Sequence, residues 1–342
     1  MASLFSRQTT SWGGRGLFAT QSIPPGTLIH TCEAPFASVV FREFRKEVCA
    51  RCFAYAFDAK RNTWNVRLDV RSGNGMWFCS DECRDEWVEE GGGGELVGQV
   101  NAAIDRVARS LQKEKGKAKE HDRTVSHPPT TDVTKQHLDE AWANADRVPK
   151  EMLDEMELEY ARFILSALIR RHREQAGVVS EANSWDDMLE LQDNELPYIQ
   201  SRPHALASQL RVFAFVCRVV AIVPALAPSV TTPQYVRELL ARDPGNVFGI
   251  YEQNRTGDSE MFGWSMYVSA SFFNHDCSPN VKKQRSGRAL SFYTTRDVAA
   301  GDELCTNYID LDEPVHKRRE QLARNWYFDC VCAKCRAESG EV

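Results

Sequence analysis

The chain has 342 residues, of which 42% are hydrophobic, so it can bury a large core in one elaborated domain or two closely joined ones. Its formal net charge of −6 argues against sequence-independent DNA binding, and no direct nucleic-acid partner is expected. No export signal is visible in residues 1–20, and the most apolar run, residues 212–227, is interrupted by Arg218 and Pro224. We therefore expect an intracellular protein of the nucleus, the cytoplasm or both, with no membrane association.

The first motif is glycine-rich, Gly13-Gly14-Arg15-Gly16-Leu17-Phe18-Ala19. Its spacing resembles a dinucleotide-binding loop, but such a loop lies between a buried strand and a helix. Here residues 6–12 are mostly polar, and the turn Pro24-Pro25-Gly26 follows too soon for a helix. The dinucleotide-binding interpretation therefore fails, and a strand is expected after the turn, at residues 28–30.

Two cysteine pairs come next, Cys49 with Cys52 and Cys79 with Cys83. The spacing C-x2-C followed by C-x3-C is typical of one structural zinc in a closed tetrahedral site, and the alternative is two unrelated pairs of free cysteines. The whole chain has 11 cysteines, an odd number. Together with the close spacings, this count favours thiolate–metal sites over disulfides.

A helix-rich region is predicted after four glycines, residues 91–94, which we expect to form a flexible joint. The charged segment 112–135 is predicted to be a loop or partly disordered. The apolar residues of the helices are assigned to the core and given no chemical role. Helical spacing of apolar residues covers residues 97–111, 152–172, 185–191, 205–223 and 234–241.

The most polar motif is Asn274-His275-Asp276-Cys277-Ser278-Pro279-Asn280, which lies between two strand-like runs. So many hydrogen-bonding side chains predict a site, and the alternative is an ordinary surface turn. Some thirty residues later the chain contains Gly301-Asp302-Glu303-Leu304 and then Asn307-Tyr308.

The last motif is Cys330-Val331-Cys332-Ala333-Lys334-Cys335. Its three thiolates fall short of the four ligands that a structural zinc prefers. The fourth ligand is expected from elsewhere in the chain, and Cys277 is the candidate.

Together these motifs resemble those of SET-domain protein methyltransferases, and their order is most similar to the SET- and MYND-domain lysine methyltransferases. The resemblance covers residues 14–335 and is weakest at residues 91–245. It implies an α+β fold: a SET-domain β-fold of small sheets with a knotted cofactor site, a helical insertion, a single-zinc MYND-like finger and a zinc-bound post-SET tail. The implied segments are the N-terminal part of the SET domain at 1–48, the finger at 49–87, the insertion at 95–243, the C-terminal SET core at 244–312 and the post-SET zinc segment at 313–342.

The finger departs from the family pattern. A full MYND finger has another cysteine pair between these two and a final His-x3-Cys, but residues 53–78 hold no Cys or His, and no His-x3-Cys follows Cys83. The finger therefore keeps one of two zinc sites, and a protein partner could still bind through it. The resemblance implies two structural zinc ions, with the ligand sets Cys49, Cys52, Cys79, Cys83 and Cys277, Cys330, Cys332, Cys335.

The resemblance also implies an enzyme, an S-adenosylmethionine-dependent protein-lysine N-methyltransferase that acts on a histone or another protein. Burial beside a cationic sulfonium disfavours the charged form of a lysine amine, so no general base is required. The catalytic residue would be Tyr308, which orients the amine and polarises the methyl group. The lysine channel would be lined by Tyr267, Trp326 and Phe328. The cofactor-binding residues would be Gly14, Arg15, Gly16, Asn246, Ser271, Phe272, Asn274, His275 and Phe328.

The alternative is a catalytically inactive SET scaffold whose zinc finger recruits protein partners. The presence of Asn274, His275 and Tyr308 favours the enzyme, because a scaffold does not need all three.

Overall fold

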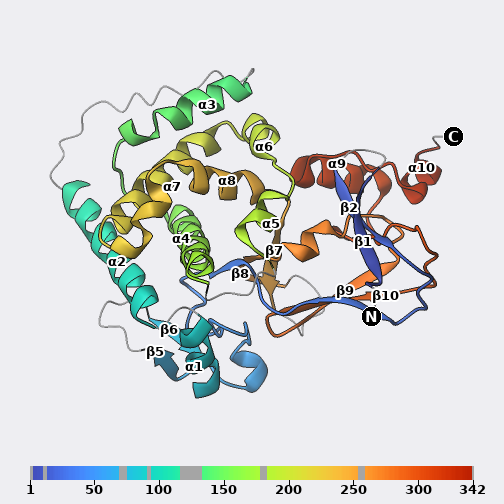
Figure 1. Cartoon of the computed structure of the whole chain (residues 1–342), viewed down its shortest axis with the longest axis horizontal. Coiled ribbons are helices and arrows are strands. Elements are labelled where there is room, and N and C mark those ends of the chain that lie inside the picture. The colour runs from blue at the N-terminus through green and yellow to red at the C-terminus, as the bar shows by residue number, and fades with distance from the viewer. Residues whose placement is uncertain are drawn as a thin grey trace.

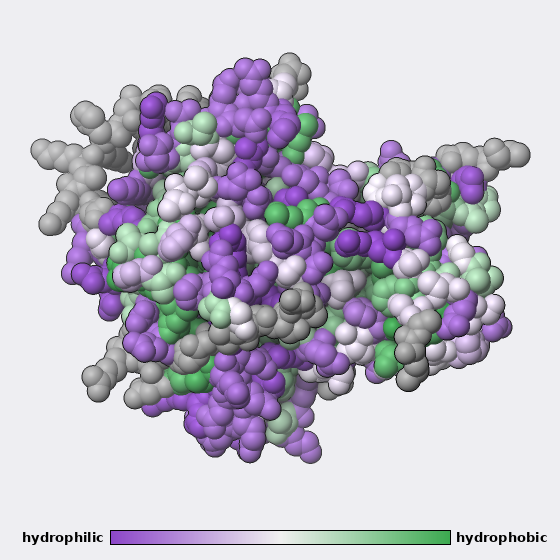
Figure 2. All heavy atoms as spheres, in the orientation of Figure 1, coloured by the Kyte–Doolittle hydropathy of each residue, from purple (hydrophilic) through white to green (hydrophobic). Residues whose placement is uncertain are grey.

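The computed structural model describes residues 3–10, 14–68, 75–90, 94–115, 133–177, 183–252 and 259–340. Figure 1 shows helices α2 to α8 gathered on one side of the molecule and most of the short strands on the other. Strands β5 and β6 and helix α1 form a separate group beneath the helices. The exposed hydrophobic residues on the face shown in Figure 2 occur in small separate groups rather than one large patch.

The described strands form two three-stranded and two two-stranded sheets, all antiparallel. One sheet has the order β3 (Leu28–Cys32), β10 (Ala289–Thr294), β9 (Val281–Ser286), and another has β4 (Ala37–Val40), β8 (Met261–Met266), β7 (Val247–Tyr251). The two-stranded sheets pair β1 (Phe5–Thr9) with β2 (Arg15–Ala19) and β5 (Val66–Leu68) with β6 (Met76–Phe78).

Both three-stranded sheets join a strand that precedes the helices to strands that follow them. Cys32 of β3 lies opposite Leu290 of β10, and Val39 of β4 lies opposite Trp264 of β8. Strand β10 buries every second residue, which is the pattern of a strand with one face on a core. The two halves of the β region therefore form one unit, with the helices inserted between them in the chain.

Helix α4 connects the helical region to this β region, because it packs against both α7 and β4. It begins with a capping box, in which the side chains of Asp154 and Glu157 each accept a hydrogen bond from the other's backbone N–H. The described α-helices are α1 (Asp81–Glu90), α2 (Gly94–Lys115), α3 (Lys135–Ala143), α4 (Glu155–Gln175), α5 (Trp185–Leu189), α6 (Glu195–Ser201), α7 (His204–Val220), α8 (Gln234–Arg242), α9 (Val315–Trp326) and α10 (Ala333–Ser339).

The five helical patterns in the sequence are confirmed as α2, α4, α5, α7 and α8, with ends shifted by a few residues. The predicted loop at 112–135 is wrong at its two ends, because α2 includes residues 112–115 and α3 starts at Lys135. Residues 116–132 and 91–93 lie outside the described residues, and Gly94, the last residue of the predicted joint at 91–94, is the first residue of α2 instead. Over the described part of the chain, no helix has the length and apolar character needed to cross a membrane.

Candidate active site

Three motifs that are far apart in the sequence lie side by side in the structure. The backbone N–H of Leu304 donates to the carbonyl of Leu17 at 2.7 Å, which places the Gly-Asp-Glu-Leu segment beside β2. The N–H of Thr306 donates to the carbonyl of Asn274 at 2.8 Å, and the N–H of Asp276 donates to the carbonyl of Thr306 at 3.0 Å. These bonds join the glycine-rich strand and the Asn-His motif to the segment that ends at Tyr308.

The Asn274 side chain connects the first of these segments to the last. Its Nδ2 donates to the carbonyl of Arg15 at 3.0 Å and to Glu303 Oε1 at 2.7 Å. A Cβ at Gly16 would lie 2.3 Å from that Glu303 oxygen and 2.8 Å from Asn274 Nδ2. Only glycine therefore fits at position 16, because this backbone lies directly against the Asn274–Glu303 pair.

His275 holds the backbone of Tyr308. Its Nδ1 accepts a hydrogen bond from the Tyr308 N–H at 3.0 Å, and its Nε2 lies 3.2 Å from Cys277 Sγ. Burial, with the positive charges of Lys283 and Arg318, lowers the pKa of His275 to about 4. The ring is therefore neutral at physiological pH, with Nδ1 as acceptor and the proton on Nε2.

The Tyr308 hydroxyl is fixed by a hydrogen bond to the carbonyl of Phe273 at 2.9 Å. Burial raises the pKa of this phenol well above its usual value, and Cys305 and Glu303 add to the effect, so the hydroxyl stays protonated. The Tyr308 ring lies 5.4 Å from the ring of Trp326. Tyr308 is thus a neutral, oriented hydroxyl beside an aromatic side chain from the C-terminal region.

A cavity of about 810 Å³ contains most of the predicted site residues. It is lined on one side by the motif residues and on the other by the chain after α9. The predicted residues that line it are Gly14, Arg15, Asn246, Ser271, Phe272, Asn274, His275, Tyr308, Trp326 and Phe328.

Two predicted residues do not line this cavity. Gly16 packs against Asn274 and Glu303, as described above. Tyr267 is only 2% exposed; its hydroxyl donates to the carbonyl of Arg288 at 2.6 Å, and its ring lies 5.7 Å from that of Phe248. The structure therefore does not bring Tyr267 to the cavity with Trp326 and Phe328.

The sequence comparison agrees with this architecture. The SET domain family matches residues 14–309 of the chain. The chain belongs to the SET domain family.

Relatives of this SET-domain protein differ in how much of the chain they cover. A potential protein lysine methyltransferase SET6 of Saccharomyces cerevisiae is 28% identical over 373 residues, covering 100% of this chain and 97% of that protein. A SET and MYND domain-containing protein of Dictyostelium discoideum is 34% identical over 45% of this chain and 29% of its own length. The histone-lysine N-methyltransferase SET5 of Yarrowia lipolytica is 38% identical over 22% of this chain and 18% of its own length.

The SET-domain protein also contains two groups of four cysteines, Cys49, Cys52, Cys79, Cys83 and Cys277, Cys330, Cys332, Cys335. Within each group all four Sγ atoms lie within 4.8 Å of one another. A tetrahedral zinc with Zn–S bonds of about 2.3 Å places its sulfurs about 3.8 Å apart. Both groups fit that size, since Cys79 Sγ is 3.4 Å from Cys83 Sγ and Cys277 Sγ is 3.5 Å from Cys335 Sγ. Each group could therefore hold a zinc ion.

A buried arginine supports the C-terminal cysteine group. Arg318 is 2% exposed, and its Nη2 lies 3.7 Å from Cys335 Sγ and 2.6 Å from Glu338 Oε2. Four thiolates around one Zn²⁺ carry a net charge of −2, so a guanidinium at this place would stabilise them. No sequence signal identified Arg318, because it lies outside every motif.

The structure shows two further charged groups that sequence reasoning missed, Glu190 in the cavity lining and Lys283 beside the backbone of Asn307. Arg15 forms an ion pair with Glu190, which follows α5 and lines the same cavity. Lys283 of β9 donates from Nζ to the carbonyl of Asn307 at 2.8 Å, and its Nζ lies 5.9 Å from the Phe248 ring centroid. Burial lowers the pKa of Lys283 to about 8.

Proposed function

We propose that this SET-domain protein is an S-adenosylmethionine-dependent protein-lysine N-methyltransferase. The observation that carries the proposal is that Asn274, His275 and Tyr308 line one cavity, with the Tyr308 hydroxyl neutral and oriented. The family match and the name of the yeast relative agree with it. The alternative of an inactive scaffold gives no reason for an oriented phenol at this place.

The cavity fits the proposed cofactor in size and chemistry. Its volume of about 810 Å³ lies in the range of small-molecule sites. The carboxylates of Glu190, Asp276 and Glu303 line it and suit a ligand with a sulfonium and an ammonium group. When bound, the cofactor would supply a methyl group on a positively charged sulfur. The residues that would hold it are Gly14, Arg15, Asn246, Ser271, Phe272, Asn274, His275 and Phe328.

The chain's own residues would act mainly by positioning. Tyr308, held through Phe273 and His275, would orient the incoming amine, and Trp326 and Phe328 would enclose it. Alignment of this kind can contribute about 7–11 kcal/mol in favourable systems. An aromatic wall attracts the cationic form of the amine by about 0.5–2 kcal/mol per ring. The amine would give its proton to water before it enters the space beside the aromatic rings, without a dedicated base.

We further propose that two zinc ions hold the architecture together. The finger at residues 49–87 would carry one, and the post-SET segment at residues 313–342 would share the other with Cys277. The second ion would fix the tail so that Trp326 and Phe328 lie against the Asn-His motif. The remaining proposed parts are the N-terminal SET segment at 1–48, the insertion at 95–243 and the C-terminal core at 244–312, which would form a knotted cofactor site.

The substrate would be a lysine-containing protein in the nucleus or the cytoplasm. A histone is one candidate, because relatives that match part of this chain are named histone-lysine N-methyltransferases. The finger would offer a place for a further protein partner.

Calorimetry with S-adenosylmethionine, followed by transfer of labelled methyl groups to a protein array, tests this proposal. We expect saturable cofactor binding at one site per chain and label on lysine side chains. Absence of cofactor binding by the zinc-replete protein would favour the scaffold instead.

A further inference from the structure

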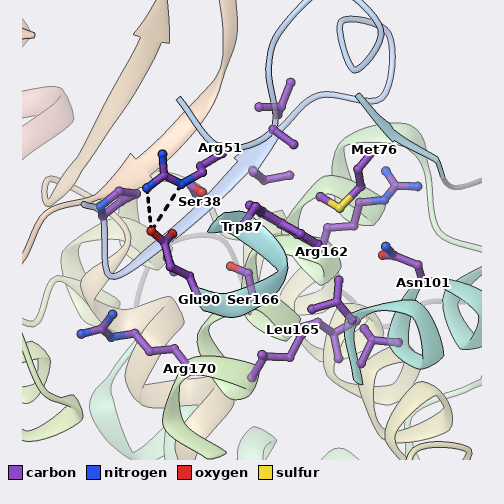
Figure 3. A pocket seen from close by; sticks show the side chains of 18 of the residues that line it. Ser38, Arg51, Met76, Trp87, Glu90, Asn101, Arg162, Leu165, Ser166 and Arg170 are labelled. Atoms are coloured by element: carbon purple, nitrogen blue, oxygen red, sulfur yellow. Dashed lines mark hydrogen bonds and ion pairs between the residues drawn. The ribbon is translucent and has the colours of Figure 1, made fainter. Parts of the chain in front are cut away.

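A second cavity, of about 490 Å³, lies between the finger, the helices and strand β4 (Figure 3). It is formed by α1, α2, α4 and the segment around β4, and it shares no lining residue with the candidate active site. Neither the family match nor the names of the relatives gives this cavity a role.

The lining of this cleft is strongly basic, although the chain as a whole carries a net charge of −6. Glu90 is the one acidic residue among the residues that line it. It pairs with Arg51 (Figure 3) and also with Arg288. The arginines that line the cleft are Arg42, Arg45, Arg51, Arg162, Arg170, Arg173 and Arg288.

The positive charge in the cleft is only partly balanced. Arg162 pairs with the buried Glu159 at 2.8 Å, and Arg51 pairs with Glu86 as well as with Glu90. Arg173 donates from Nη2 to the carbonyl of Glu89, and its buried Nε has no hydrogen-bond partner within the described part of the chain. Burial lowers the pKa of Arg173, and the pKa of Arg45 is lowered by burial and by the charges of Arg42 and Arg162. Closely spaced, desolvated guanidiniums favour an anion between them.

The apolar floor lies between arginines at its two ends. One face of α4 lines the cleft with Arg162, Leu165, Ile169 and Arg173, and α2 adds Val97, Val100 and Ile104. Arg162 and Arg173 are eleven residues apart, which separates them by about 16 Å along the helix axis. One small anion cannot reach both ends, whereas an extended peptide of about five residues spans that length.

The geometry points to a docking cleft for an acidic peptide segment of a partner protein. Two carboxylates about four residues apart would contact Arg42 and Arg45 beside Arg162 at one end and Arg173 at the other. An apolar side chain between them would lie on Ile169, because Leu165 is already buried. This inference does not depend on methyl transfer, because the cleft is separate from the candidate active site.

Calorimetry of the zinc-replete full chain tests this with the unlabelled peptide acetyl-Glu-Glu-Leu-Phe-Glu-Glu-amide at low ionic strength. A peptide with Gln at each Glu position is the matched probe. We expect the Glu peptide to bind at least about tenfold more tightly, a difference of about 1.4 kcal/mol. Equal affinities for the two peptides, or no binding of either, would overturn the proposal.

Variants of the chain locate the binding. The variant Arg173→Gln is expected to weaken binding of the Glu peptide about tenfold, while Arg106→Gln on the exposed side of α2, which removes the same charge, leaves it unchanged. Thermal melts confirm that both variants are folded. Equal losses of peptide affinity in the two variants would show nonspecific charge attraction. Inorganic phosphate that competes with an affinity equal to that of the peptide would show a site for a small anion. Either result would contradict a peptide cleft.

Discussion

His275 Nδ1 accepts the backbone N–H of Tyr308 at 3.0 Å, so the Asn-His motif directly positions the residue proposed as catalytic. The same histidine contacts Cys277. Cys277 forms one cysteine group with the three cysteines of the C-terminal segment. The cavity, the Tyr308 phenol and the cysteine group thus depend on one short turn. A substitution that disturbs one of these three parts should therefore affect the other two.

The close approach at Gly16 gives a first prediction. The change Gly16→Ala should destabilise the protein by about 1–3 kcal/mol and weaken cofactor binding, because the new Cβ would collide with Glu303 and Asn274. Gly98→Ala on helix α2 is the control, since nothing lies within 4 Å of a Cβ there. It should be neutral or stabilising by up to about 1 kcal/mol. Denaturant unfolding measures both, and equal stability of the two variants would contradict the packing described here.

The two cysteine groups predict two zinc ions per chain. Metal analysis of Cys83→Ala and of Cys335→Ala should each give one zinc, but the second variant should lose much more methyl transfer. The reason is that the Cys335 group adjoins Tyr308 and Trp326, whereas the finger group packs around Phe78 and Trp64. Three zinc ions in the unaltered chain, or equal losses of activity, would be inconsistent with this assignment.

Lys283 predicts a pH-dependent stability difference. Its pKa falls from 10.5 to about 8 in the folded protein, so the charged form is disfavoured by folding. Lys283→Met should therefore stabilise the protein below about pH 8, by about 1–3 kcal/mol, and the gain should disappear as the pH rises towards 10.5. Lys282→Met, at the exposed neighbouring position of β9, is the control. The measurement is the melting temperature of each variant relative to wild type across this pH range. A stabilisation of Lys283→Met that persists at high pH would refute the argument.

The predicted role of Tyr267 differs from its position in the structure. The sequence places it in the lysine channel, but its hydroxyl donates to the Arg288 carbonyl outside the cavity. Tyr267→Phe should cost about 1 kcal/mol of stability through the lost hydrogen bond and leave methyl transfer within a few-fold of wild type. Mass spectrometry of the methylated product checks this. A changed ratio of mono- to dimethyl-lysine would contradict the prediction, because a residue of the lysine channel would alter that ratio.

Local patterns predicted much of the fold. Regular apolar spacing located α2, α4 and α7. The cysteine spacing indicated the first group and three members of the second, and Cys277 was the candidate for its fourth member. Helix α3 was missed because it follows a charged, proline-containing segment, and its start depends on a capping box between Thr134 and His137.

Contacts to residues outside the motifs could not be predicted. The pair Arg15–Glu190 joins residues that are 175 positions apart, and although Arg15 belongs to the glycine-rich motif, nothing in the sequence around Glu190 marks it as its partner. The basic cleft likewise collects arginines from the segment after β4, the finger, helix α4 and the turn between β9 and β10, and only the tertiary structure brings them together.

Methyl transfer by Tyr308→Phe tests the central claim most directly. With labelled S-adenosylmethionine and a protein array, this variant should bind the cofactor normally and lose about 10²–10³-fold in transfer, because it lacks the oriented hydroxyl. Tyr293→Phe, a tyrosine of β10 that does not line the cavity, should retain wild-type transfer. Undiminished transfer by Tyr308→Phe would contradict the proposed role of the phenol.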